Sequence, residues 1–269
     1  MSTPTPDAIE REAVSVSRPR PHVALLRLAA RPLGVLRIAV KRAMLEVLDA
    51  AERDPEVRAL VLTGEGRAFS VGSDVREFEH DAGWLKRAEA VENELNDRIE
   101  ASRLPVIAAI NGHALGGGLV LALACDLRIA AESARLGVPE VKVGAFASGG
   151  GTQRLPRLIG RGRALRLLLT GRIIEAREAV AIGLVDEVAA DAALLDTALD
   201  LAAGIAAMPA LAVAASKACV NAGLRDGWAS GMALELEHLV TVGLSDDAIE
   251  GQRAFIEKRE PSFSSGKRP

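Results

Sequence analysis

The chain has 269 residues, a formal net charge of −3, 49% hydrophobic residues and only 3% aromatic residues. This composition lacks the basic footprint and the stacking side chains of a nucleic-acid-binding protein. Its two cysteines give no disulfide framework, and its four scattered histidines indicate no metal site. We expect one large α/β domain, with or without an appendage, that binds neither metal nor nucleic acid.

The N-terminal residues 1–20 are rich in Pro, Ser and Thr and lack the apolar region of a signal peptide. We interpret them as a flexible lead-in. The longest apolar stretch, Ala114 to Cys125, is too short to span a membrane and contains three glycines. The sequence therefore predicts a soluble, cytoplasmic protein with no membrane contact.

Apolar runs and helical periodicities alternate along the first part of the chain. In chain order they predict a strand over 22–28, a helix over 35–53, strands over 57–62 and 68–71, a helix over 77–102, a strand over 105–110, a helix over 119–124, a strand over 127–130 and a helix over 152–159. This alternation predicts βαβ units and a mainly parallel sheet. Beyond about residue 190 the pattern is nearly all helix, with breaks at 208–209 and 223–227.

Two expected strand-to-helix junctions are rich in small residues, at 69–74 and 111–118. Each leaves unpaired backbone N–H groups at the positive end of a helix. If the two junctions converge, they form a site for an oxyanion from backbone alone. Spacing by itself favours a plainer explanation, in which the glycines only permit tight turns and close packing.

Several common motifs are absent from the sequence. The chain has no P-loop, no HExxH and no GxSxG, and its turn Gly64-Glu65-Gly66 lacks the remaining parts of a dinucleotide fingerprint. Hydride transfer with a Rossmann-bound cofactor is therefore unsupported.

Two sets of motifs are specific in combination. One is the run 114–118, Ala-Leu-Gly-Gly-Gly, with Cys-Asp at 125–126, and the other is 151–155, Gly-Thr-Gln-Arg-Leu, followed by Leu-Thr-Gly at 169–171. With these motifs the chain resembles the enoyl-CoA hydratase/isomerase (crotonase) superfamily. The resemblance implies an α/β fold with a spiral core of ββα turns, here 21–200, and a C-terminal helical region, 201–269, that builds trimers or hexamers made of two trimers.

The resemblance also implies a chemistry, the stabilisation of a coenzyme A thioester enolate. The backbone N–H groups of Ser73 and Gly117 match the two donors that hold the thioester oxygen. Such preorganised donors are each worth about 3–4 kcal/mol of barrier. Coenzyme A is then part of the acyl-CoA substrate, and no separate cofactor is expected.

Hydratases of this family use two glutamates, and the chain matches only one of them. Glu140 follows Pro139 as the family pattern requires, whereas Val120 stands at the other position. A single glutamate at the Glu140 position resembles the Δ3,Δ2-enoyl-CoA isomerases of the family. Ser148 stands where dienoyl-CoA isomerases carry an aspartate. We therefore expect an enzyme in which Glu140 is the acid/base, with isomerisation slightly favoured over hydration.

Three alternatives stay open. In the first, the chain is a β-oxidation hydratase in which another carboxylate, from Glu77, Glu79 or Asp81, replaces the missing one. In the second, it is an inactive homologue that only binds acyl-CoA. In the third, it is a specialised lyase or thioester hydrolase that uses the same oxyanion hole.

The resemblance places further substrate contacts along the two junctions and near the C-terminus. The expected substrate-binding residues are Gly72, Asp74, Arg76, Gly116, Val120, Phe255 and Lys258. Arg76 matches a basic position near the coenzyme phosphates, and Phe255 and Lys258 match positions that commonly reach the coenzyme of the adjacent subunit. Arg76 and Lys258 are also explained as solvated surface charges, and Phe255 as a core aromatic.

Overall fold

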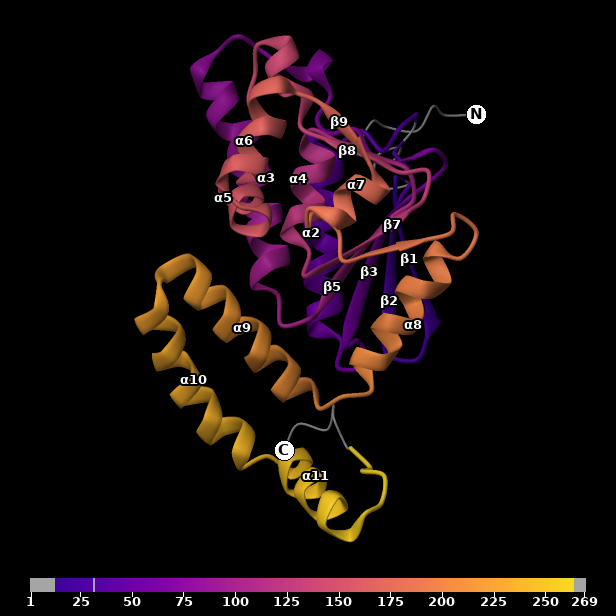
Figure 1. Ribbon diagram of the computed structural model, residues 1–269, viewed down its shortest axis with the longest axis vertical. Coiled ribbons are helices and arrows are strands. Elements are labelled where there is room, and N and C mark those ends of the chain that lie inside the picture. The colour runs from indigo at the N-terminus through magenta and orange to yellow at the C-terminus, as the bar shows by residue number, and fades with distance from the viewer. Residues whose placement is uncertain (1–12, 31, 264–269) are drawn as a thin grey trace, which may run out of the picture.

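The computed structural model describes residues 13–30 and 32–263, which form two sheets surrounded by helices (Figure 1). The larger sheet has six strands in the spatial order β1 (Val14–Arg20), β2 (Val23–Leu28), β3 (Ala59–Gly64), β5 (Val106–Ile110), β7 (Leu127–Ala131) and β10 (Glu187–Ala189). The smaller has four, in the order β4 (Ala68–Ser70), β6 (His113–Leu115), β8 (Arg135–Gly137) and β9 (Ile173–Glu175).

Parallel pairing dominates both sheets, as the alternating pattern predicts. In the larger sheet β2, β3, β5, β7 and β10 pair in parallel, with Leu60 opposite Val106 and Ile107 opposite Leu127. Every residue of β3 and β5 is buried. Apart from Thr63, whose hydroxyl donates to the carbonyl of Ala109, these runs carry no polar side chain, as expected for a parallel sheet covered on both faces.

Helices cover the sheets and connect their strands. They are α2 (Ile38–Arg53), η1 (Val75–Glu77), α3 (Ala82–Ala101), α4 (Gly117–Ala124), η2 (Pro139–Val143), α5 (Gly151–Ile159), α6 (Arg161–Thr170), α7 (Ala176–Ala181), α8 (Leu194–Ala206), α9 (Ala210–Asp226), α10 (Trp228–Gly243) and α11 (Asp246–Glu257). α8 packs on β3 and β5, and α2 packs on α3. α4 is apolar on all sides and is buried from its second residue onward, which is typical of a core helix.

The prediction of a flexible lead-in over residues 1–20 is wrong for Val14–Arg20. Residues 1–12 lie outside the described residues, but Val14–Arg20 form β1, an edge strand antiparallel to β2. The signal was the Val-Ser-Val-Ser alternation of 14–17, which has the period of a strand. Pro19 reads as a breaker in the sequence, yet proline is tolerated on an edge strand, where its missing N–H interrupts no ladder.

Two other boundaries differ from those expected. The long polar helix begins at Ala82, where Asp81 caps it by accepting a hydrogen bond from the N–H of Trp84 at 2.7 Å. The break predicted over 223–227 is confined to Gly227, because Gly223 continues α9 and packs against Gly231 of α10. A Cβ on Gly231 would lie 3.0 Å from the Cα of Gly223, so the two glycines allow these helices to cross closely.

The C-terminal helices α9, α10 and α11 extend away from the body of the molecule (Figure 1). Lys217 of α9 ties them to it, because its Nζ donates to Asp126 at 2.7 Å and to the carbonyls of Ile99 and Leu104. No single helix of the described residues is long and apolar enough to cross a membrane, and the one pair that passes together, α8 with α9, is bent by 106°.

Candidate active site

Two glycine-rich turns meet at one end of the smaller sheet. β4 ends at Ser70 and β6 at Leu115, and because these strands pair in parallel, the turns that follow them are neighbours. A Cβ on Gly72, whose φ is +88°, would lie 2.7 Å from the backbone nitrogen of Gly117. A Cβ on Gly117 would lie 3.6 Å from the nitrogen of Ser73. The two N–H groups singled out in the sequence are therefore brought together.

Both N–H groups are available to a ligand. Within residues 13–30 and 32–263 no acceptor is found for the N–H of Ser73 or of Gly117. Gly117 opens α4, and the residue before it, Gly116, gives no side-chain cap. Unpaired donors at a helix N-terminus favour a negative charge. The arrangement can hold an oxygen on which negative charge develops during a reaction.

Glu140 lies beside this pair of donors. It is in the first turn of η2, directly after Pro139, and its Oε1 is 3.4 Å from the position that a Cβ on Gly116 would occupy. Its Oε2 is buried and has no hydrogen-bond partner among the described residues. Burial raises the pKa of Glu140, its own backbone N–H opposes this, and the charge of Glu92 raises it further. Such a carboxyl group is suited to accept and return a proton.

A second carboxylate, Glu92 of α3, lies at the same place. Its Oε2 accepts hydrogen bonds from Lys41 Nζ at 2.6 Å and from the Ser73 hydroxyl at 3.2 Å. Its Oε1 is 3.1 Å from the Cβ position of Gly117 and 2.7 Å from that of Gly149. Lys41, from α2, has a side chain only 4% exposed and also donates to Ser73 Oγ at 2.9 Å. Neither Glu92 nor Lys41 is among the site residues expected from the sequence.

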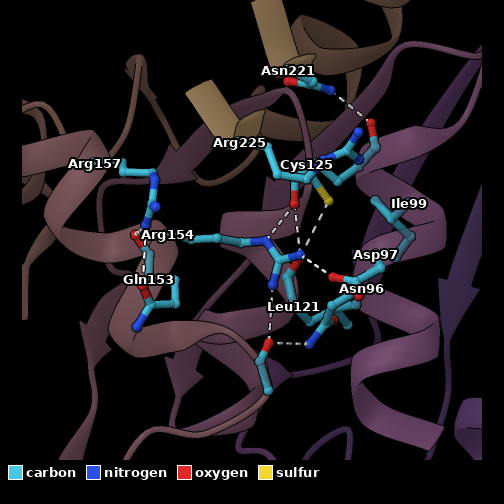
Figure 2. A network of polar contacts seen from close by, with 12 residues as sticks. Asn96, Asp97, Ile99, Leu121, Cys125, Gln153, Arg154, Arg157, Asn221 and Arg225 are labelled. Carbon is cyan, nitrogen blue, oxygen red and sulfur yellow. Dashed lines mark hydrogen bonds and ion pairs between the residues drawn. The ribbon is translucent and has the colours of Figure 1, made fainter. Parts of the chain in front are cut away.

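Helix α3 is fixed against the loop that precedes α5. The carbonyl of Gly149 accepts from Asn96 Nδ2 at 2.9 Å and from Arg154 at 3.0 Å, and its N–H donates to Glu89 at 2.8 Å. Figure 2 shows Arg154 extending to α3, where it pairs with Asp97 at 2.6 Å. These contacts determine where α3 places Glu92 relative to the N-terminus of α4.

The three carboxylates that the sequence offered as replacements have other surroundings. Glu77 accepts from the backbone N–H of Ile38, Glu79 is exposed, and Asp81 caps α3. Val120 is 1% exposed, and its Cγ2 would be 2.8 Å from a Cβ on Gly151. It therefore packs between α4 and α5 as core.

The expected coenzyme contacts divide into two groups. Asp74 is buried near the turn and accepts two hydrogen bonds from the guanidinium of Arg76, which lower the pKa of Asp74 to about 2. The Arg76 side chain itself is 75% exposed. Phe255 is 85% exposed on α11, and Lys258 ends this helix with φ at 55°. Figure 1 shows α11 at the far end of the C-terminal helices, so within one chain these two are not brought to α4.

No group of three or more His, Cys, Asp or Glu side chains able to hold a metal ion occurs in the part of the chain that the structure describes. The groups that the described residues bring to the site are two backbone donors, two carboxylates and one buried ammonium group.

Comparisons with known proteins show which family and fold the chain resembles. The family model described as enoyl-CoA hydratase/isomerase matches residues 21–266. The chain is 41% identical to the crotonyl-CoA hydratase of Syntrophomonas wolfei, covering 84% of this chain and 88% of that one, and 38% identical to the short-chain-enoyl-CoA hydratase of Clostridium acetobutylicum, covering 86% and 89%. The crystal structure of an enoyl-CoA hydratase from Bacillus anthracis superposes with a TM-score of 0.90 at 38% identity, covering 95% of this chain and 100% of that one.

Proposed function

The chain belongs to the enoyl-CoA hydratase/isomerase family of enzymes, and we propose that it stabilises an acyl-CoA enolate with the N–H groups of Ser73 and Gly117 while Glu140 transfers a proton. One observation carries this proposal: the buried Oε2 of Glu140 has no partner among the described residues, and the carboxyl group adjoins the turn that presents the two donors. Coenzyme A enters as part of the substrate.

Double-bond isomerisation is the reaction that these groups can complete with one carboxylate. Glu140 takes a proton from C2 of a 3-enoyl-CoA, and the electron pair of the broken C–H bond passes to the thioester oxygen, where the two N–H groups bind the negative charge. The dienolate then takes the same proton back from Glu140 at C4, and the double bond moves to C2–C3. Proton and electrons balance without any other group.

Conversion of 3-hexenoyl-CoA to 2-hexenoyl-CoA tests this proposal. We expect Glu140→Gln to lower kcat by about 10²–10⁴-fold, because the amide cannot accept the C2 proton. The matched control is Glu94→Gln, which changes an exposed carboxylate on α3 and should leave the rate unchanged. A Glu140→Gln variant within tenfold of the parent rate would exclude Glu140 as the proton carrier.

A second candidate is the hydration of a 2-enoyl-CoA. It needs a group that holds and deprotonates water in addition to Glu140. The carboxylate of Glu92 beside Gly117 favours this reaction, and all three of the similar proteins described above are named as hydratases.

We also propose that the enzyme is a homotrimer or a dimer of trimers. The C-terminal helices expose large apolar side chains that a monomer leaves in water; among them are Val220, Leu224, Trp228, Leu236, Leu239, Leu244, Phe255 and Ile256. In a trimer, Phe255 and Lys258 would reach a neighbour's coenzyme, while Arg76 meets the phosphates of its own. Light scattering should give three or six chains, and Leu239→Asp should lower that number; a monomeric parent protein would refute this.

A further inference from the structure

We propose that Glu92 is a catalytic residue of this site, the second carboxylate, which binds and deprotonates the water that adds to C3 of a 2-enoyl-CoA. The inference rests on the proposed function, because it uses the oxyanion hole of Ser73 and Gly117 and the proton carried by Glu140. It assigns to helix α3 the role for which α4 offers only Val120.

The two carboxylates flank neighbouring residues of one turn. Glu140 approaches Gly116 from η2, with Oε1 3.4 Å from the Cβ position of that glycine, and Glu92 approaches Gly117 from α3 at 3.1 Å. They are close enough for the charge of Glu92 to contribute to the raised pKa of Glu140. A substrate whose thioester oxygen binds at Gly117 therefore lies close to both carboxylates.

The two oxygens of Glu92 have different surroundings. Oε2 is fixed by the Lys41 ammonium at 2.6 Å and by the hydroxyl of Ser73 at 3.2 Å. For Oε1 no hydrogen-bond donor is found in the described part of the chain. One oxygen is therefore anchored, and the other is available to accept a hydrogen bond from water, which is the arrangement that a general base requires.

Glycines leave the space around the available oxygen. A Cβ on Gly149 would lie 2.7 Å from Oε1, closer than a real contact allows, and the φ of Gly149 is +62°. A Cβ on Gly149 would therefore displace Oε1, and a Cβ on Gly117, at 3.1 Å, would crowd it, so glycine at both positions leaves room for Oε1 where it lies. Asn96 and Arg154, which hold the carbonyl of Gly149, keep this loop against α3.

The reaction balances with these two groups. Water loses a proton to Glu92 and its oxygen bonds to C3, while the π electrons of C2=C3 shift to form the thioester enolate in the oxyanion hole. The enolate then takes the proton of Glu140 at C2, which gives the 3-hydroxyacyl-CoA. The proton left on Glu92 passes through solvent to Glu140, and both carboxyl groups are restored.

Two reactions of one variant distinguish this inference from the proposed function. Hydration of crotonyl-CoA needs both carboxylates, whereas exchange of the C2 protons of butyryl-CoA with deuterated water needs only Glu140 and the oxyanion hole. We expect Glu92→Gln to lower hydration by at least about 10²-fold and to change exchange by less than about threefold. The amide oxygen that this substitution introduces still accepts from Lys41, so intact exchange also shows that the site is folded.

Each outcome decides one of the two claims. If Glu92→Gln hydrates crotonyl-CoA like the Glu94→Gln control, or if it loses exchange together with hydration, Glu92 is not the water base. A parent enzyme that exchanges but does not hydrate crotonyl-CoA overturns the inference and leaves the proposed function standing. A Glu140→Gln variant that keeps exchange overturns the proposed function instead.

Discussion

Backbone forms one side of the site, and charged side chains form the other. On the backbone side, the positive φ of Gly72 and the missing Cβ of that residue let two turns approach until the nitrogens of Ser73 and Gly117 are neighbours. On the charged side, Glu140, Glu92 and Lys41 come from η2, α3 and α2, which lie far apart in the sequence. The first side depends on short local motifs, and the second depends on how separate helices pack.

The difference predicts how each side fails when it is altered. The backbone side loses its geometry when a Cβ is added at Gly72, because that atom would lie 2.7 Å from the backbone nitrogen of Gly117. The charged side loses its electrostatic balance when one partner is removed, because a buried ion left alone is costly.

The largest effect expected on the charged side is that of Lys41→Met. This substitution leaves the Glu92 carboxylate, which is 13% exposed, without its ammonium partner. We therefore expect the free energy of unfolding to fall by about 3–5 kcal/mol. Urea denaturation measures this. Lys86→Met, an exposed lysine of α3, should change stability by less than about 0.5 kcal/mol. Equal stabilities of Lys41→Met and the parent would show that the ion pair contributes nothing.

The corresponding test of the backbone side is Gly72→Ala. The new Cβ would lie 2.7 Å from the Gly117 nitrogen, so we expect exchange and hydration to fall together by about 10²–10³-fold. Gly183→Ala is a matched control, because it has a similar φ of +78° but no heavy atom within 4 Å of the Cβ position. A variant at Gly72 that lost only hydration would disprove a shared oxyanion hole.

The two sides also differ in how far the sequence predicts them. The junctions at 69–74 and 111–118 are visible as glycine-rich ends of apolar strands, and the structure places them together. The role of Glu140 follows only from the family motif, because a lone Pro-Glu pair has no chemical signal. The core was likewise predicted by its apolar periods, whereas β1 was missed because its proline and serines resemble a linker.

Glu92 could not have been identified from the sequence. Helix α3 carries several other glutamates, including Glu89, Glu94 and Glu100, and on a polar helix each looks like a solvated charge. What separates Glu92 from them is Lys41, which is buried in α2 beside Val40 and Met44. A lysine in such surroundings needs a partner, but only the packing of α2 on α3 shows which carboxylate it meets.

The pH dependence of exchange tests the proton carrier on the charged side. Glu140 must be ionised to accept the C2 proton, and burial raises its pKa, so the midpoint should lie above the ordinary value of 4.5. Below the midpoint the rate should fall about tenfold per pH unit. The folded state binds the Glu140 proton more tightly than the unfolded chain does. The free energy of unfolding therefore falls as pH rises from the pKa of Glu140 in the unfolded chain to its raised pKa in the folded protein. Glu140→Gln should therefore be more stable than the parent at pH 7, with the gain vanishing below the ordinary value; a midpoint at or below 4.5 would contradict this.

Val120 gives the smallest expected effect on catalysis. Its side chain, 1% exposed, packs against Gly151, so Val120→Ala should lower stability by about 1.5–3 kcal/mol through lost burial and a cavity. We expect exchange and hydration to change by less than about threefold, because neither side of the site uses this residue. Urea denaturation and the two assays measure both effects. A large loss of hydration alone would instead place Val120 against the substrate or its water, and the role of orienting that water would then be shared between α4 and Glu92 of α3.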